Sequence, residues 1–342
     1  MSSPESKFTF PSPIGGAPSH QDFAPSVLFS VLYGLLFPIM IYRLVRSSSR
    51  TFVLIKTKYF VIERTVILAL RAAMSPYGRL PAVKLLINYT QTTLNVGHVA
   101  LAANLVLLLR SLLVQATANP ARSSSIETHD PGSISMVSLK PSDVRVEIVE
   151  VTAAWSVHRQ KERFWYRRIT GFILLGCLTA FLLGVISGFI YWNATIDEGQ
   201  AQLEQRLRYT AACVTLLLLL VIQGLAIYGA VMVQNIIKSS AWLVAGLATL
   251  LNVVTIYHFI AMRQQTEGST THALALHNVK PLSEGSDAAF YICQIAPEWI
   301  VSSILISIDV KKAFRTGKWG DAWLNNKAPV HNSPEEVNSA VV

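Results

Sequence analysis

Charge is scarce in this sequence. Asp, Glu, Lys and Arg make up 14% of the 342 residues, against about 25% in typical soluble domains. A soluble all-helical protein would have to bury several apolar helices completely, so the composition argues against one. Runs of about 18 or more apolar residues recur, and each is long enough to cross the roughly 30 Å hydrocarbon core of a bilayer. The sequence therefore predicts a polytopic integral membrane protein.

Several kinds of site chemistry are also missing. No Gly-rich phosphate loop precedes a helix, and no Gly-x-Ser-x-Gly elbow occurs. His98 and His258 stand alone, without the clustered ligands that a catalytic zinc ion needs. The three cysteines lie within apolar segments and give no disulfide framework. These absences predict a protein that is not an enzyme and that carries no metal or other cofactor.

Seven apolar segments succeed one another along the chain. They are expected at Phe23–Leu44, Phe52–Met74, Ala82–Leu113, Tyr166–Trp192, Leu207–Val233, Ser240–Met262 and Ala288–Asp309. Each is long enough for one crossing. The sequence therefore predicts an all-α fold, a seven-transmembrane helix bundle over residues 23–310.

The basic residues predict the orientation. Twenty of the 29 Lys and Arg residues flank the segments on one side and seven on the other, while Arg64 and Arg71 lie inside the second segment. The richer side is expected to be cytoplasmic, which puts the amino terminus outside and the carboxyl terminus inside. The sequon at Asn193, a predicted glycosylation site, falls in an outer connection on this arrangement. The net charge of +9 indicates lipid contacts rather than nucleic-acid binding.

Three stretches lie outside the expected spans. Residues 1–22, rich in Ser, Pro and Gly, are expected to be a disordered extracellular tail. Residues 114–165 form a long cytoplasmic connection, Ser-rich at first, whose two alternating runs around Pro141 predict either a small β-hairpin or an irregular loop. Residues 311–342 are expected to be a basic juxtamembrane segment followed by a disordered cytoplasmic tail.

Ionisable side chains occur within two of the expected spans. Glu63, Arg64 and Arg71 lie on the second, and Glu298 follows Pro297 on the seventh. Such groups cost about 2.5–3.5 kcal/mol at the membrane centre, so they are expected to face the bundle interior. Arg71 and Glu298 reach similar depths at 1.5 Å per residue, which predicts an ion pair. The alternative pairs Glu63 with Arg64 or Arg71 and leaves Glu298 protonated. Pro297 is expected to kink its helix.

Polar side chains form stripes on the helices. The third segment carries Asn88, Gln91, Asn95 and His98 at helical spacing, the seventh carries Tyr291, Gln294, Glu298 and Ser302, and Gln223, Asn252 and His258 add single groups on the fifth and sixth. These residues predict either a polar central cavity or a dry hydrogen-bonded seam. The candidate ligand contacts are Glu63, Arg64, Arg71, Asn88, Gln91, Asn95, His98, Asn252, His258, Gln294 and Glu298.

Two resemblances follow from particular stretches. The seven-helix layout and "VKKAFRTGKWGDAW" look like G-protein-coupled receptors, although "APEW" stands where those have Asn-Pro-x-x-Tyr. "FAPSVLFSVLYGLLF", and Glu63 followed by Arg71, resemble the orphan seven-helix membrane proteins of fungi, including the lipid-translocating-exporter-like family linked to aminocholesterol resistance. The Glu-to-Arg spacing departs from that family. The resemblance, over residues 23–315, implies a related architecture and transfers no substrate.

The sequence favours a receptor-like protein that senses a small or lipid-like ligand. Ligand contacts are expected from the second, third, sixth and seventh helices, and the long inner connection would reach a cytosolic signalling partner. Two alternatives are a lipid or small-molecule transporter and a scaffold acting through residues 114–165. The plasma membrane is the expected location.

Overall fold

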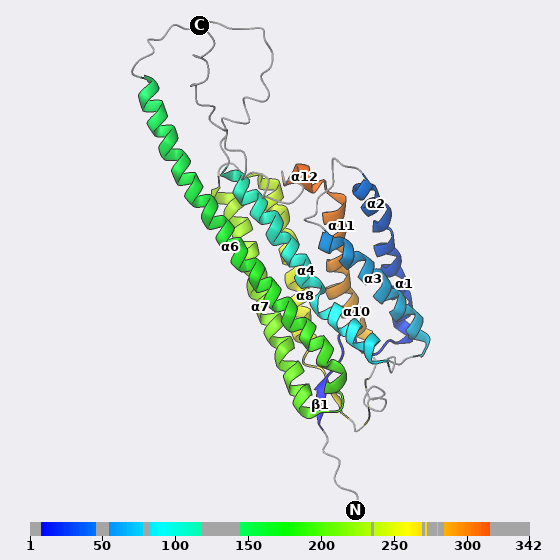
Figure 1. The fold of residues 1–342 in the computed structure, drawn as a ribbon. Coiled ribbons are helices and arrows are strands. Elements are labelled where there is room, and N and C mark those ends of the chain that lie inside the picture. Colours follow the sequence, from blue (N-terminus) through cyan, green and yellow to red (C-terminus); the bar gives the residue numbers. More distant parts are fainter. Residues whose placement is uncertain are drawn as a thin grey trace, which may run out of the picture.

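The computed structural model describes residues 8–45, 55–77, 83–117, 144–233, 236–268, 271, 279 and 284–314. Within these ranges the chain forms a bundle of long helices with a two-stranded sheet at one end (Figure 1). The long helices are α1 (Phe23–Gly34), α2 (Leu36–Val45), α3 (Ile55–Met74), α4 (Lys84–Ala116), α6 (Val144–Ala194), α7 (Glu198–Met232), α8 (Lys238–Ala261) and α11 (Ala296–Ser307). The shorter elements are β1 (Thr9–Pro11), η1 (His20–Asp22), η3 (Ser75–Tyr77), β2 (Gln265–Glu267), α10 (Glu284–Phe290), the π-helical η4 (Tyr291–Ile295) and α12 (Val310–Ala313).

Six helical stretches in the described ranges are long and apolar enough to cross a membrane. They are His20–Val45, Lys84–Ala116, Lys161–Ala194, Glu198–Met232, Lys238–Ala261 and Ser286–Ser307. The expectation of an all-α membrane protein is confirmed. The segment expected at Phe52–Met74 forms α3, which is not among the six because five of its 20 residues are charged.

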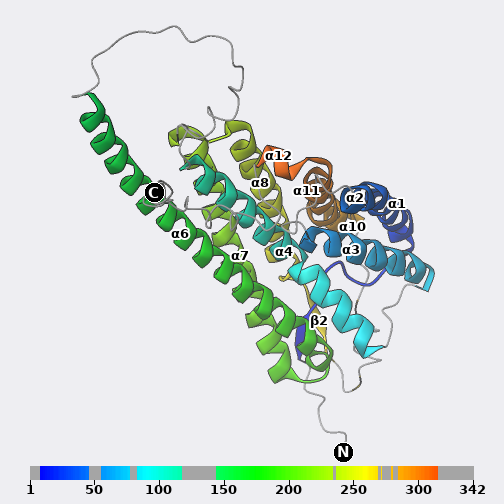
Figure 2. The same ribbon diagram turned by 45° about the horizontal axis from the view of Figure 1, so that its top comes forward.

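The helices are arranged around α4 and α8. Figure 2 shows α6 and α7 on one side of this pair and α1, α2, α3 and α11 on the other, in agreement with the helix contacts. The apolar stretch of α4 is therefore 78% buried, and hydrophobic side chains lie all around it, as expected of a helix surrounded by others. Polar groups on α4 must find their partners inside the protein.

Two glycines let α6 approach α4 closely. Gly184 and Gly188 lie one turn apart on α6 and face α4. A Cβ at Gly188 would lie 2.7 Å from the Cα of Thr92, while the carbonyl of Gly184 accepts a hydrogen bond from Asn95 Nδ2 at 3.3 Å. Small residues four apart are a common device for close packing of membrane helices. The contact fixes the distance between the two helices.

The expected disordered tail is wrong for residues 8–22. β1 pairs antiparallel with β2, with Phe10 opposite Thr266, and Phe10 and Ile14 are buried. Serine, proline and glycine suggested a segment unable to bury apolar surface, but the bundle supplies the surface against which these two side chains pack. Residues 1–7 lie outside the described ranges.

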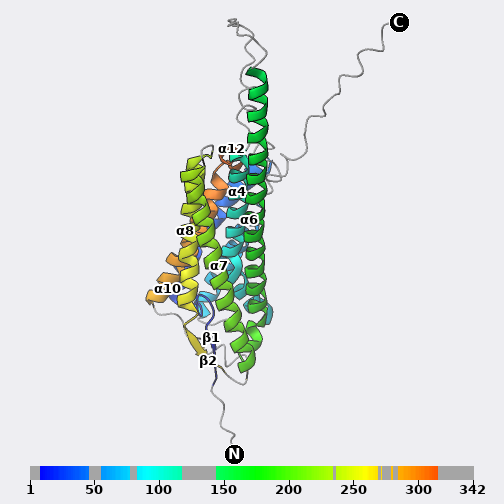
Figure 3. The same cartoon turned by 90° about the vertical axis from the view of Figure 1, so that its left-hand side faces the viewer.

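About half of the expected connection at residues 114–165 is helix instead. α4 continues to Ala116, and α6 begins at Val144 and runs for 51 residues, rising beyond the other helices in Figure 3. No hairpin forms from Val144 onward. Extending an existing helix adds a hydrogen bond per residue without a new nucleus, which outweighs a short alternating pattern. Residues 118–143, which include most of the Ser-rich stretch, lie outside the described ranges.

We expect Gly188→Ala to destabilise the bundle, because the new Cβ meets the Thr92 backbone, which cannot rotate away. Gly246→Ala on α8 is the matched control, since nothing lies within 4 Å of its added Cβ, and it should stabilise by up to about 1 kcal/mol through helix propensity. Thermal denaturation in detergent measures both. Equal melting temperatures for the two variants would contradict the close contact between α4 and α6.

Candidate functional site

A buried ion pair links α3 to α11. Arg64 Nε donates to Glu298 Oε2 at 2.8 Å and Arg64 Nη2 to Oε1 at 2.9 Å, and both side chains are fully buried. The Arg64 guanidinium lies 4.7 Å from the centre of the Phe60 ring. Gly97 of α4 packs against it so closely that a Cβ there would overlap Arg64. A two-pronged bond of this kind fixes the position of α3 relative to α11.

The predicted pair between Arg71 and Glu298 is therefore wrong, and so is the alternative within the second helix. Arg71 Nη2 instead donates to Asp22 Oδ2 at 3.0 Å and to the carbonyl of Gly15. Arg64 and Arg71 are seven residues apart and share a helix face, so either could have met Glu298. The depth comparison failed because Asp22, the partner that Arg71 takes, belongs to the segment expected to be disordered.

The helix that carries Glu298 changes its winding one turn earlier. η4 is π-helical immediately before α11, whose second residue is Pro297. Proline has no N–H to donate to the preceding turn, and a π-turn is a common way to absorb such a break, frequently at functional sites. Tyr33 Oη contacts the carbonyl of Ile295 at 3.5 Å. The expected disturbance at Pro297 is a π-turn that aims Gln294 and Glu298 into the bundle.

The polar stripe on α4 serves several neighbours rather than one cavity. Asn88 Nδ2 donates to the carbonyl of Phe189 at 3.0 Å and its Oδ1 accepts from Trp192 N at 3.1 Å, so Asn88, like Asn95, binds α6. Gln91 and His98 lie roughly 60–80° further round the helix, at about 100° per residue. Gln91 accepts a hydrogen bond from Ile14 N at 2.9 Å. The seam interpretation holds for these amides.

His98 meets His258 of α8 in the bundle core. The two rings are nearly perpendicular, with centroids 4.7 Å apart, and both are buried. Neither nitrogen of His98 has a hydrogen-bond partner in the described part of the chain, and the same holds for His258 Nε2, Arg64 Nη1 and Gln294 Oε1. Asn252 is directed elsewhere, since its Nδ2 donates to Gln223 on α7 at 3.1 Å.

The sequence prediction also missed a third buried ion pair. Glu204 and Arg208, one turn apart on α7, bond to each other. Ser187 Oγ donates to Glu204 Oε1 at 3.2 Å, and Arg208 Nη1 donates to the carbonyl of Ser12 at 3.1 Å. The Glu-x-x-x-Arg spacing was the available signal, but α7 was expected to begin only at Leu207, which left Glu204 in a loop and Arg208 at the very start of the span.

A large groove lies between α3, α4 and α6, and we call it the lateral groove. Its volume is about 980 Å³. Small residues of α4, among them Gly97 and Ala100, form its floor, and the side chains of α3 and α6 form its walls. On α6 it extends from Gly171 to Phe189, about 27 Å at 1.5 Å per residue. Phe189 and other wall residues are exposed on the surface, so the groove opens sideways.

Glu63 is the one predicted ligand contact that lines the lateral groove. It is half-buried, and no hydrogen bond or ion pair to it occurs within the described residues. Arg64, its neighbour in sequence, faces the core and is held by Glu298. Most of the remaining lining is apolar, with Lys56 toward one end. The expected polar cavity on the bundle axis is therefore replaced by a largely apolar groove at its side.

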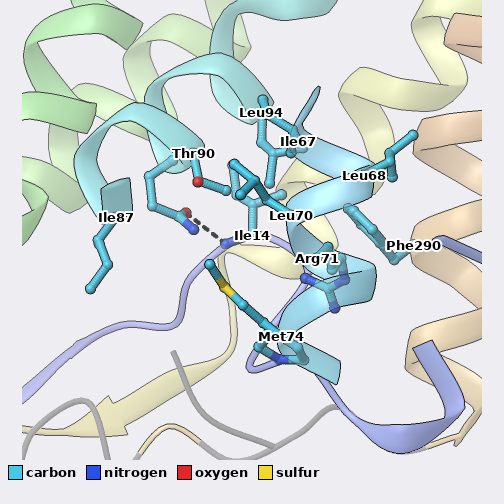
Figure 4. Close-up of a pocket in the computed structure, with 13 residues that line it drawn as sticks. Ile14, Ile67, Leu68, Leu70, Arg71, Met74, Ile87, Thr90, Leu94 and Phe290 are labelled. Carbon is cyan, nitrogen blue, oxygen red and sulfur yellow. Dashed lines mark hydrogen bonds between the residues drawn. The ribbon is translucent and has the colours of Figure 1, made fainter. Parts of the chain in front are cut away.

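A small pocket of about 40 Å³ lies beneath the amino-terminal segment. Figure 4 shows Ile14 below Leu94 and Ile67 of the helices, with Arg71 and Phe290 to its right. The dashed line marks the Gln91 bond to Ile14 N. The pocket is too small for a drug-sized ligand, which needs several hundred Å³. It marks where the segment packs rather than a separate ligand site.

We expect Glu298→Gln to lower the stability of the protein by about 3–5 kcal/mol, because it leaves a buried guanidinium without a counter-ion. The double variant Arg64→Met/Glu298→Leu should regain most of that loss, since apolar residues of similar volume can replace a buried ion pair. Thermal denaturation in detergent tests both, with exposed Glu198→Gln as the control. A Glu298→Gln variant that melts with wild type would contradict a structural ion pair.

No group of three or more His, Cys, Asp and Glu side chains that could hold a metal ion occurs among the residues described. Comparison with known protein families gives no match, and comparisons with curated proteins and with solved structures give none either. What the geometry establishes is an integral, multi-pass helical membrane protein whose interior is joined by buried ion pairs and whose side carries a large apolar groove.

Proposed function

We propose that the protein is a seven-helix, receptor-like membrane protein that binds a lipid-like ligand in the lateral groove. The groove itself carries this proposal. Its volume lies within the 300–1,000 Å³ typical of ligand pockets, and its length of about 27 Å nearly matches the roughly 30 Å hydrocarbon core. A bilayer surrounds the opening, so an amphiphile can enter sideways. Glu63 offers its polar group a partner within an otherwise apolar lining.

The proposed seventh span is α3. Two of its five charged side chains, Arg64 and Arg71, are buried against Glu298 and Asp22, so the lipid does not meet them. β1 and α12 lie at opposite ends of the bundle in Figure 1, which supports an odd number of crossings. The distribution of Lys and Arg then favours an outer amino terminus.

Epitope tags test this topology. A tag before Thr9 should be accessible on intact cells, while a tag at the carboxyl terminus should become accessible only after permeabilisation. Glycosidase treatment should increase the gel mobility of wild type but not of Asn193→Gln, because Asn193 lies exposed at the end of α6 that the topology places outside. Tags that are accessible from the same side would contradict seven crossings.

A path for signalling leads from the lateral groove to the ion pair. Phe60 and Gly97 line the groove, and both also contact the Arg64 guanidinium. A ligand that contacts these two residues stabilises one position of α3, and the bond between Arg64 and Glu298 couples that position to α11. Since a ligand shifts an equilibrium only through unequal affinity for its two states, this shared contact is what makes the groove a sensor.

The length of the lateral groove also favours a second function. A groove that reaches across most of the hydrocarbon core could guide a lipid between leaflets, which is the transporter alternative. Transport of fluorescent lipid between the leaflets of reconstituted vesicles separates the two. Transport that Ala100→Trp abolishes would favour the transporter, whereas binding without transport favours the receptor.

We expect wild-type protein to retain a lipid-like molecule through purification, detected by native mass spectrometry. Ala100→Trp should lower the retained amount by at least about tenfold, equivalent to 1.4 kcal/mol, because the indole fills the groove. Leu220→Trp, on the exposed face of α7, is the matched control and should retain as much as wild type. Equal amounts of retained lipid in the two variants would contradict a ligand site in the lateral groove.

A further inference from the structure

We propose that the end of the bundle that carries β1 is a peptide-binding site, which residues 9–16 of the same chain occupy as a tethered ligand. Three helices (α3, α4 and α7) and the strand β2 bind the backbone of this segment, and a fourth helix, α6, packs against Phe10. The site, which we call the peptide site, is separate from the lateral groove and does not depend on the function proposed for the groove.

The backbone of the segment is bound nearly group by group. The β2 ladder pairs with Thr9, Phe10 and Pro11, and Ser12 N donates to the carbonyl of Gln264 at 3.0 Å. Arg208 of α7 then binds the Ser12 carbonyl at 3.1 Å. Adding a strand to a sheet edge in this way is a recurrent mode of peptide recognition.

The second half of the segment is also bound through its backbone. Gln91 of α4 accepts from Ile14 N at 2.9 Å, and Arg71 of α3 donates to the Gly15 carbonyl. Gly15 and Gly16 have φ of 80° and 63°, a region that side-chain-bearing residues rarely adopt. The chain therefore turns tightly where Arg71 reaches it.

Two side chains anchor the segment. Phe10 is fully buried and packs edge-on against Tyr191, with ring centroids 6.2 Å apart. Ile14 is buried, and it lines the small pocket together with residues of α3 and α4 (Figure 4). Two apolar anchors four residues apart, with backbone bonds between them, define the ligand class: an extended peptide that ends in a Gly-Gly turn.

Burying Arg71 and Arg208 at one end of a membrane protein is costly, and a purely structural plug would need only apolar contacts. Each arginine has a carboxylate partner besides the segment, Asp22 for Arg71 and Glu204 for Arg208. Each would therefore keep its counter-ion if the segment left. A two-stranded sheet is also only marginally stable by itself. Release of the segment thus leaves no unpaired buried charge, which makes exchange with another peptide feasible.

The test uses the full chain with a weakened tethered ligand, the variant Phe10→Ser/Ile14→Ser. A fluorescent synthetic peptide of residues 8–18 should bind this variant saturably in a polarisation assay. It should bind wild type at least about tenfold more weakly, because the tethered segment competes at an effective concentration in the millimolar range. A peptide that carries the same two serines is the matched control and should bind neither protein.

Replacing Gln91 by Ala in the weakened chain should reduce its binding of the fluorescent peptide, since the change removes the acceptor for Ile14 N. A folded, monodisperse variant that binds the wild-type peptide no better than the control peptide would show that the segment is a fixed plug. If the double variant does not fold, hydrogen exchange of the wild-type chain decides. Amides of residues 9–16 that exchange well before those of α4 support the peptide site, and exchange only on global unfolding overturns it.

Discussion

A fully buried charge inside this bundle has to be satisfied by the protein, because the surrounding lipid offers neither water nor counter-ions. The bond between Arg64 and Glu298 is the central case, since it joins α3 to α11 through two hydrogen bonds with no exposed surface. It explains how a carboxylate lies midway along an apolar helix and how α3 can belong to the bundle despite its charge. The pairs of Arg71 with Asp22 and Arg208 with Glu204 follow the same rule.

The sequence was enough to predict the helices but not their partners. Apolar length and periodicity located the long helices, because those features depend on neighbouring residues alone. However, α6 begins at Val144 rather than Tyr166, and α7 begins at Glu198 rather than Leu207. Pairing depends on register between helices, and Arg64 and Arg71 offered Glu298 equivalent faces. The decisive residue was Asp22, which composition assigned to a disordered tail, and only the packing of Phe10 and Ile14 places it.

The candidate site shows the same limit. Polar stripes correctly indicated which side chains are buried, but they could not distinguish a shared cavity from a hydrogen-bonded seam. Asn88 and Asn95 of α4 donate to backbone carbonyls of α6, which glycines bring within reach. The open volume lies where α3 and α6 stand apart over small residues of α4. A groove of this kind is space that the packed side chains do not fill, so the pattern of residues in a single sequence does not predict it.

The continuity of α6 has a mechanical consequence. One unbroken helix of 51 residues supplies a wall of the lateral groove and then projects beyond its neighbours. The part before Lys161, outside the candidate span, is about 26 Å long at 1.5 Å per residue. Gly184 and Gly188 hold α6 against α4 near the opposite end of the helix. A small tilt of α6 at the groove wall would therefore displace its far tip by a larger distance.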